Sequence, residues 1–133
     1  MPWQFDFDST NKILRCSLSG RVTDAILKEF YGLIVQNAAR TDPLSGVTDF
    51  SGVTSFEVSP QTLRDLARSA PAMPDPSRAR VVVAPADLVF GMARMFQIEA
   101  SDSRPNLHVV RTMPEAWAIL GVKDPQFAPL QDA

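Results

Sequence analysis

The feature that most constrains the fold is a run of three valines, Val81–Val83, which stops near a proline and leads into a long apolar segment. Consecutive β-branched residues are typical of a strand that is buried on both faces of a sheet. Pro85 cannot continue a central strand. Asp87 suits the first turn of a helix, because its carboxylate accepts hydrogen bonds from free backbone N–H groups. This strand followed by a helix predicts an α/β fold.

The N-terminal residues alternate between apolar and polar side chains, as a strand with one buried face does. Trp3, Phe5 and Phe7 alternate with Gln4, Asp6 and Asp8, and residues 14–18 repeat the pattern after a polar turn at residues 9–11. Two such runs joined by a short turn predict a β-hairpin. Because the second face of each strand is polar, we expect this part of the sheet to be covered on one side only.

Three further helices are predicted from residues that favour helix ends. Ser or Thr at the N-cap, Pro at the first position, a Thr–Glu capping box and a final Gly are typical of such ends. The predicted helices run from Thr23 to about Ala39, from Ser59 to before Pro71, and from Thr112 to Gly121.

Residues 47–50 are predicted to form a short third strand that ends in a turn at residues 51–53, and residues 107–110 to form a fifth strand. The predicted order is therefore ββαβαβαβα, a mixed α/β sheet of about five strands with four helices. We expect residues 1–121 to form a single domain and residues 122–133 to form an extended C-terminal tail.

Composition narrows the class of function. The chain of 133 residues has a net charge of −2 with scattered basic residues, which disfavours nucleic acid as its main partner. No apolar stretch is long enough to span a membrane. A single cysteine, Cys16, cannot form an internal disulfide, and the N-terminus does not resemble a secretion signal, so we expect a cytoplasmic protein.

Ordinary enzyme chemistry has no candidate residues. The single histidine, His108, lies within a predicted strand, and Cys16 alternates with leucines, so both are expected to be structural. No cluster of residues has the spacing of a metal site, and no glycine-rich phosphate loop is present. We therefore predict a protein that is not an enzyme and has no metal or cofactor.

Two features remain as candidates for a site. Ligands of open α/β sheets bind at the carboxyl ends of the parallel strands, where the sequence places Asp49, Ser51 and Asp87. The alternative is that these residues only cap helices and form turns.

The helix that begins at Asp87 carries more apolar surface than one core-facing side needs. Its predicted core side consists of Leu88, Val89, Met92, Ala93, Met95 and Phe96. Phe90 and Ile98 lie outside that side, near Arg94, which suggests a partner surface or a hydrophobic pocket. The alternative is that Phe127 or Leu130 of the C-terminal tail covers them.

The order of elements and four short segments resemble the STAS-type, SpoIIAA-like domains, in the branch grouped with the CRAL-TRIO lipid-binding proteins. The segments are residues 20–23, 48–53, 90–96 and 115–120. The resemblance implies a mixed sheet of about five strands with helices, as in anti-sigma-factor antagonists. In those proteins a serine after the third strand is phosphorylated by a partner kinase.

The phosphorylation motif of those antagonists is matched only in its first half. Asp49-Phe50-Ser51 corresponds to the Asp-Leu-Ser of the motif, and Ser59 falls at the position of the phosphorylated serine. Glu57, Val58 and Pro60 depart from the second half. The sequence alone explains Ser59 as an N-cap, and the resemblance implies phosphorylation as the alternative.

We therefore expect a cytoplasmic STAS-like regulatory domain that is not an enzyme and binds a protein partner or a second copy of itself. The surface expected to do so consists of Phe90, Arg94 and Ile98 with the neighbouring strand-end loops. The CRAL-TRIO side of the resemblance implies a different function, the carriage of a small hydrophobic ligand between sheet and helices. Its pocket would be lined by Phe50, Phe90, Met92, Met95 and Phe96.

Overall fold

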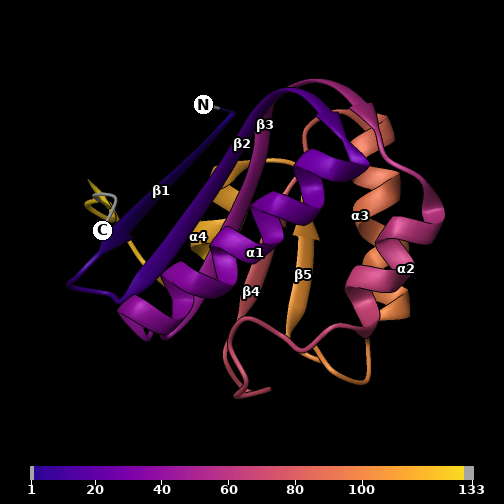
Figure 1. Cartoon of the computed structure of the whole chain (residues 1–133). Helices are drawn as coiled ribbons and strands as arrows, with labels where there is room; N and C mark the ends of the chain where they lie inside the picture. Colours follow the sequence, from indigo (N-terminus) through magenta and orange to yellow (C-terminus); the bar gives the residue numbers. More distant parts are fainter. Residues whose placement is uncertain (1, 131–133) are drawn as a thin grey trace.

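The computed structural model describes residues 2–130, which form an α/β structure with a mixed six-stranded sheet and four helices (Figure 1). The elements are β1 (Trp3–Asp8), β2 (Ile13–Thr23), α1 (Asp24–Thr41), β3 (Ser45–Glu57), α2 (Pro60–Arg68), β4 (Arg80–Val83), α3 (Asp87–Glu99), β5 (Leu107–Val110), α4 (Met113–Leu120) and β6 (Ala128–Pro129). The predicted α/β class and the order of the first nine elements are confirmed.

The strands lie in the order β5-β4-β3-β2-β1-β6. Neighbouring strands from β2 to β5 are parallel, whereas β1 is antiparallel to both β2 and β6. The valine run forms β4, between β3 and β5, and Val81 and Val83 are at most 1% exposed. A strand with apolar residues on both faces needs cover on both faces.

The capping residues begin the helices where the sequence predicts. The Thr23 hydroxyl accepts a hydrogen bond from the Ile26 backbone N–H at 3.3 Å, and Ser59 Oγ accepts one from Thr62 N–H at 3.2 Å. Thr112 and Glu115 form the predicted capping box of α4. These bonds satisfy donors that a helix N-terminus otherwise leaves free.

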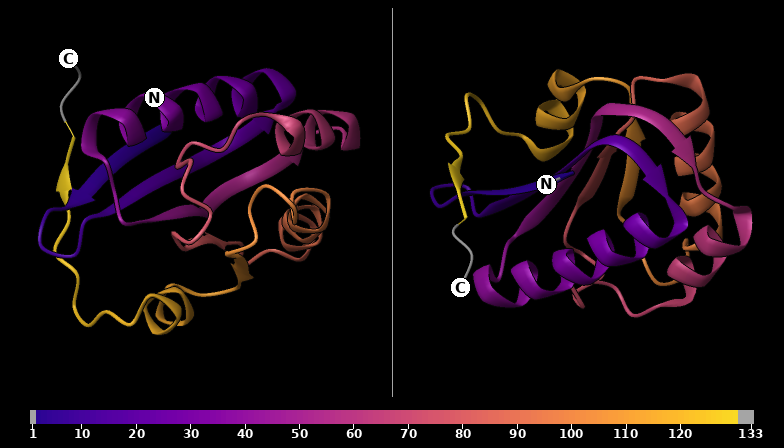
Figure 2. Two further views of the ribbon diagram at one scale, coloured as in Figure 1. Left: turned by 90° about the horizontal axis from the view of Figure 1, so that it is seen from below. Right: turned by 45° about the horizontal axis from the view of Figure 1, so that its top comes forward.

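Helices cover both faces of the sheet. Figure 2 shows α1 and α2 on one side and α4 with the following C-terminal segment on the other. The larger core cluster lies under α1 and α2, and the smaller one consists of sheet residues packed against Ala116 of α4, with Trp117 and Phe127 beside it. The sheet is therefore the middle layer of three.

The predicted one-sided cover of the N-terminal hairpin is wrong. Asp6 and Asp8, expected on a solvated face, are 3% and 1% exposed. Residues 122–130 pass over that face, and β6 pairs with Asp6 and Phe7. The last three residues of the predicted tail, 131–133, lie outside the described residues. Asp6 is paired with Arg15 at 3.1 Å, and the Arg15 guanidinium stacks on Phe127, so the buried charge has a partner.

The predicted turn at residues 51–53 is also wrong, because β3 continues through it to Glu57. Beyond Asp49, β3 no longer pairs with β4 but stays paired with β2, through two register irregularities. A Cβ atom at position 52 would lie 2.9 Å from Ser19 Cβ. Gly52 therefore allows the two strands to approach closely at a bulge, and it does not mark a turn.

Candidate functional site

An apolar cavity of about 160 Å³ lies between the sheet and the helices α1, α2 and α3. Its wall combines residues of the strands β2, β3, β4 and β5 with one side of each helix and residues of two loops. The lining residues are Leu14, Cys16, Leu27, Phe30, Tyr31, Ile34, Ala38, Gly46, Val47, Thr48, Phe50, Phe56, Leu63, Leu66, Ala72, Met73, Arg80, Val81, Val82, Val89, Ala93, Phe96, Arg104 and Leu107. With few exceptions these side chains are apolar, which suits an apolar molecule.

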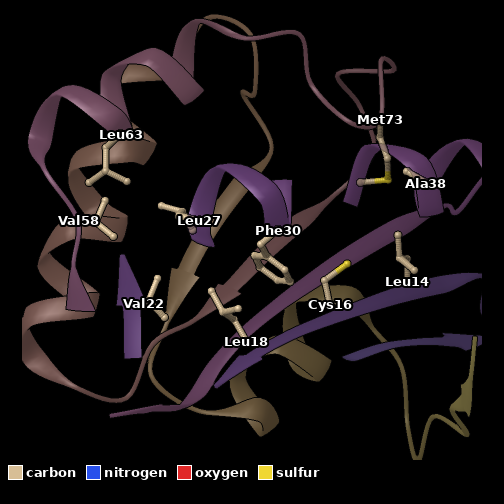
Figure 3. Packing of buried hydrophobic residues seen from close by; sticks show 10 residues of the cluster. All are labelled: Leu14, Cys16, Leu18, Val22, Leu27, Phe30, Ala38, Val58, Leu63 and Met73. Carbon is tan, nitrogen blue, oxygen red and sulfur yellow. The ribbon is translucent and has the colours of Figure 1, made fainter. Parts of the chain in front are cut away.

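Small residues at facing positions account for the space. Ala38 on α1, Ala93 on α3 and Gly46 on β3 all line the cavity, and none has a side chain long enough to cross it. Figure 3 shows Phe30 of α1 directed toward Cys16 and Leu18 of the sheet. A Cβ atom on Gly46 would lie 3.4 Å from the terminal methyl carbon of Met73, so the loop after α2 closes this part of the wall.

Two of the polar residues in the wall, Tyr31 and Arg104, are hydrogen-bonded to each other, and a third, Arg80, donates to backbone carbonyls. The Tyr31 hydroxyl donates a hydrogen bond to the Ala70 carbonyl and accepts one from Arg104 Nη2 at 2.9 Å. Arg80 donates to the carbonyl of Met73, which also lines the cavity. Burial and the neighbouring charge of Arg104 lower the pKa of Arg80, while Tyr31 and Asp75 oppose that shift. The apolar cavity therefore has positive charge in its wall.

The pocket residues expected from sequence divide into two groups. Phe50 and Phe96 line the cavity. Met92 and Met95 pack against the larger core cluster without lining the cavity. Phe90 lies elsewhere, with its ring centroid 4.2 Å from the guanidinium carbon of Arg111, so the cation covers one face of the ring.

The outer surface of α3 differs in part from the expected one. Ile98 is 68% exposed, and Arg94 is also exposed. Leu88, expected in the core, is 61% exposed, because the buried side of α3 is centred on Val89 and Ala93 and Leu88 points about 100° away from Val89. The C-terminal segment does not cover this surface, since it pairs with β1 while α3 packs beside β5.

The predicted strand-end residues do not form one site. Asp87 is paired with Arg111 at 2.5 Å, beyond the ends of β4 and β5. Asp49 and Ser51 lie within β3, where Asp49 Oδ1 accepts hydrogen bonds from both the backbone N–H and the hydroxyl of Ser51. Asp49 also borders a second hollow with a mixed polar lining, next to Trp3 and Ser17. The expected cluster at strand ends is therefore split into local contacts.

The residues expected to be structural have structural surroundings. Cys16 is 3% exposed, and burial, together with the charge of Asp6, raises the pKa of its thiol far above the ordinary value. The His108 ring is within 2.7 Å of the Asn106 side-chain oxygen. Within residues 2–130, no group of three or more histidine, cysteine and acidic side chains could hold a metal ion. No helix in the same range is long and apolar enough to cross a bilayer.

The sequence reasoning missed the cationic part of the cavity wall. Arg104 follows Ser-Asp-Ser and precedes Pro, a composition that predicts an exposed loop. Its 4% exposure results from contacts with α1 and α2, which are distant in sequence. One signal was available: a tyrosine on the core side of α1 needs a hydrogen-bond partner for its hydroxyl.

Comparison with protein-family models, with curated proteins and with solved structures gives no match to this chain. The resemblance to STAS-type domains therefore stays a prediction from sequence.

Proposed function

We propose that this chain binds a small apolar molecule in the cavity between the sheet and the helices α1, α2 and α3. The observation that carries the proposal is the cavity of about 160 Å³ with its apolar lining. The hollow is partly open to solvent, so when it is empty its apolar lining stays uncovered, at a cost of roughly 25 cal/mol per Å² of apolar surface. A domain of this size has a free energy of unfolding of roughly 5–15 kcal/mol, so the space is an expensive feature unless a ligand uses it.

The volume limits the ligand to the size of a single ring. A dry apolar cavity of roughly 150 Å³ holds one benzene molecule, and the present cavity is comparable. A long-chain lipid would need more space than these residues leave. The ligand class we infer is therefore an aromatic ring, or an aliphatic group of about the same bulk.

The resemblance to STAS-type domains grouped with CRAL-TRIO proteins supports the same class of function. That resemblance implies a hydrophobic ligand between sheet and helices, and a mixed α/β sheet is the kind of fold it implies. Under this proposal the chain is a carrier or sensor that is not an enzyme. A regulatory role through a protein partner, as in the antagonists of that family, would then use the ligand as its signal.

The test is whether toluene stabilises the protein and whether filling the cavity abolishes that effect. At toluene concentrations about ten times Kd, the melting temperature should rise by about 4–7 °C. Ala38→Leu places three extra carbons toward the cavity and should remove the rise. Ala39→Leu, at the neighbouring exposed position of the same helix, is the matched control and should keep it.

If Ala38→Leu does not fold, Ala93→Leu replaces it in the test, because Ala93 lines the cavity from α3. Two results would contradict the proposal. One is the absence of any shift in the wild type with toluene; the other is an equal shift in the wild type and in a folded cavity-filled variant.

A second candidate function is self-association through the outer side of α3. It is favoured by the exposure of Ile98 and Leu88, at 68% and 61%, since large apolar side chains exposed on one helix are typical of a contact surface. Arg94 lies between them on α3 and would form part of the contact. Two copies would then meet through the same surface, as in a two-fold symmetric dimer.

A further inference from the structure

Arg104 is a buried cation without a carboxylate partner. It is 4% exposed, and within residues 2–130 the ion pairs of arginines involve Arg15, Arg21, Arg78 and Arg111. Arg104 donates to the carbonyls of Leu66, Ala67 and Ser69 and to the hydroxyls of Tyr31 and Ser103. All five acceptors are neutral, so its positive charge is opposed only by the dipole at the end of α2 and by the ring of Phe96, whose centroid lies 5.3 Å from the guanidinium carbon.

Arg80 adds a second cation to the same wall. It donates to the carbonyls of Met73, Asp75 and Arg78, which are again neutral. The charge of Asp75 offsets that of Arg80 only in part, because the carboxylate of Asp75 is held by Ser77 and lies 3.6 Å from Arg78 Nε, and Arg80 forms no ion pair with it. Arg80 is half-buried and is near enough to Arg104 for the charge of Arg104 to lower its pKa.

Each of the two guanidinium groups has a donor to spare. Neither the Arg80 nor the Arg104 Nε–H has an acceptor among the residues that the structure describes, although every fully buried side-chain nitrogen there has a partner. Arg104 has no carboxylate partner and Arg80 has only a partial one, so their free donors beside an apolar hollow are complementary to a single anion. Each arginine can donate its Nε–H to one oxygen of a carboxylate, and such charge-assisted hydrogen bonds are stronger than neutral ones.

We propose that the ligand is a small organic acid, with a body of about one ring in the cavity and a carboxylate bound by Arg80 and Arg104. The inference rests on the proposed function, because the ring must first fit the cavity. The Tyr31 hydroxyl lies beside Arg104 Nη2 and is the third polar group at this end. The neutral carbonyls around both arginines already accept most of their N–H donors. The few donors that stay free can bind the two oxygens of a carboxylate, but they are too few for a phosphate.

Benzoate and its neutral amide, benzamide, test the inference because they have nearly the same shape. By calorimetry at pH 7, the wild type should bind benzoate at least tenfold more tightly than benzamide. Arg80→Gln should reduce that ratio to near one. Arg78→Gln is the matched control, because it removes the same charge two residues away. Arg78 is outside the cavity wall and is paired with Asp42, so this variant should keep the ratio.

Arg104 anchors the end of α2, so we choose Arg104→Lys and not Arg104→Gln as the second variant. The lysine keeps the charge but has no Nε–H, so it should lower benzoate affinity severalfold. Equal binding of benzoate and benzamide by the wild type would overturn the inference, and so would a ratio unchanged in Arg80→Gln. In either case binding of toluene would leave the cavity proposal standing. Failure of toluene, benzoate and benzamide alike would remove both.

Discussion

Asp8 connects three parts of the chain through one buried carboxylate. It accepts hydrogen bonds from Thr10 N–H at 2.9 Å, from both the backbone and the side chain of Asn11, and from Gln126 N–H at 3.2 Å. Burial opposes ionisation of the carboxyl, but the four hydrogen bonds outweigh burial and lower the pKa of Asp8. The turn between β1 and β2 and the C-terminal segment thus depend on the same charge.

We expect Asp8→Asn to lower the free energy of unfolding by about 1–3 kcal/mol at pH 7, because the amide has one acceptor atom and turns its NH₂ toward N–H donors. The folded pKa is lowered, so the stabilisation is present above the pKa of an unfolded aspartate, about 3.9, and is lost as pH falls through the folded value. The difference from wild type should therefore shrink below about pH 4.

Urea unfolding between about pH 3 and pH 7 measures the Asp8 effect. Asp102→Asn is the matched control, because Asp102 is exposed and has no hydrogen-bond partner among residues 2–130. If Asp8→Asn and Asp102→Asn had the same free energy of unfolding across this range, the carboxylate of Asp8 would not be the connecting group.

At the scale of elements, the N-termini of α1 and α2 share a carboxylate. Ser59 Oγ caps α2, and the Ser59 backbone N–H donates to Asp24 Oδ1, in the first turn of α1, at 2.8 Å. This backbone hydrogen bond is the main cause of the lowered pKa of Asp24. Ser59 is therefore already next to a negative charge, which matters for the phosphorylation that the family resemblance implies.

We expect Ser59→Ala to lower the free energy of unfolding by about 1 kcal/mol, through loss of the cap. Asn and Asp ordinarily cap as well as Ser, so Ser59→Asn should restore most of the stability. Ser59→Asp should not, because its charge would face Asp24. Thermal unfolding of the three variants at pH 7 gives the comparison. Equal stability of Ser59→Asp and Ser59→Asn would mean that the site tolerates a phosphate.

At the scale of the whole molecule, the two faces of the sheet have different roles. The face under α1, α2 and α3 contains the cavity. The opposite face is closed by α4 and the C-terminal segment, where Trp117 and Phe127 lie 5.7 Å apart between ring centroids. Ligand binding is thus separated from the outer surface of α3, whose exposed leucine and isoleucine remain available for a second copy of the chain.

If that surface forms a two-fold symmetric dimer, Ile98→Asp should weaken it strongly. Burial of one isoleucine contributes about 1.5–3 kcal/mol, and symmetry doubles the loss, so the dissociation constant should rise more than a hundredfold. Sedimentation velocity measures the change. Val35→Asp alters an exposed valine on α1, at 39% exposure, and should leave the mass unchanged. A wild type that sediments as a monomer at high concentration would exclude this surface as a dimer contact.

Much of the fold could be predicted from local patterns. The N-caps at Thr23 and Ser59, the capping box at Thr112 and the valine strand all lie where the sequence places them. Hydrogen bonds between neighbouring residues and the periodicity of apolar side chains depend on a few consecutive residues, so they can be recognised without knowledge of the rest of the chain.

The candidate site could be predicted only in part. Phe50 and Phe96 were expected in a pocket and line the cavity, but the same expectation for Phe90 was wrong, because Arg111 from another loop stacks on its ring. Leu88 was expected to be buried and is exposed. Helical periodicity gives the direction of the side that faces the core; it does not give how wide the buried side is, and Val89 next to Leu88 is buried.

The sequence by itself determined the α/β class, the order of the first nine elements and the ends of most helices, because these depend on short-range interactions. Only the tertiary structure decided that β3 continues past Gly52, that the C-terminal segment buries Asp6 and Asp8, and that Arg80 and Arg104 line the same cavity. Each of these results from contacts between residues that are far apart in the chain, where packing and the pairing of buried charges decide between conformations that local patterns leave equally open.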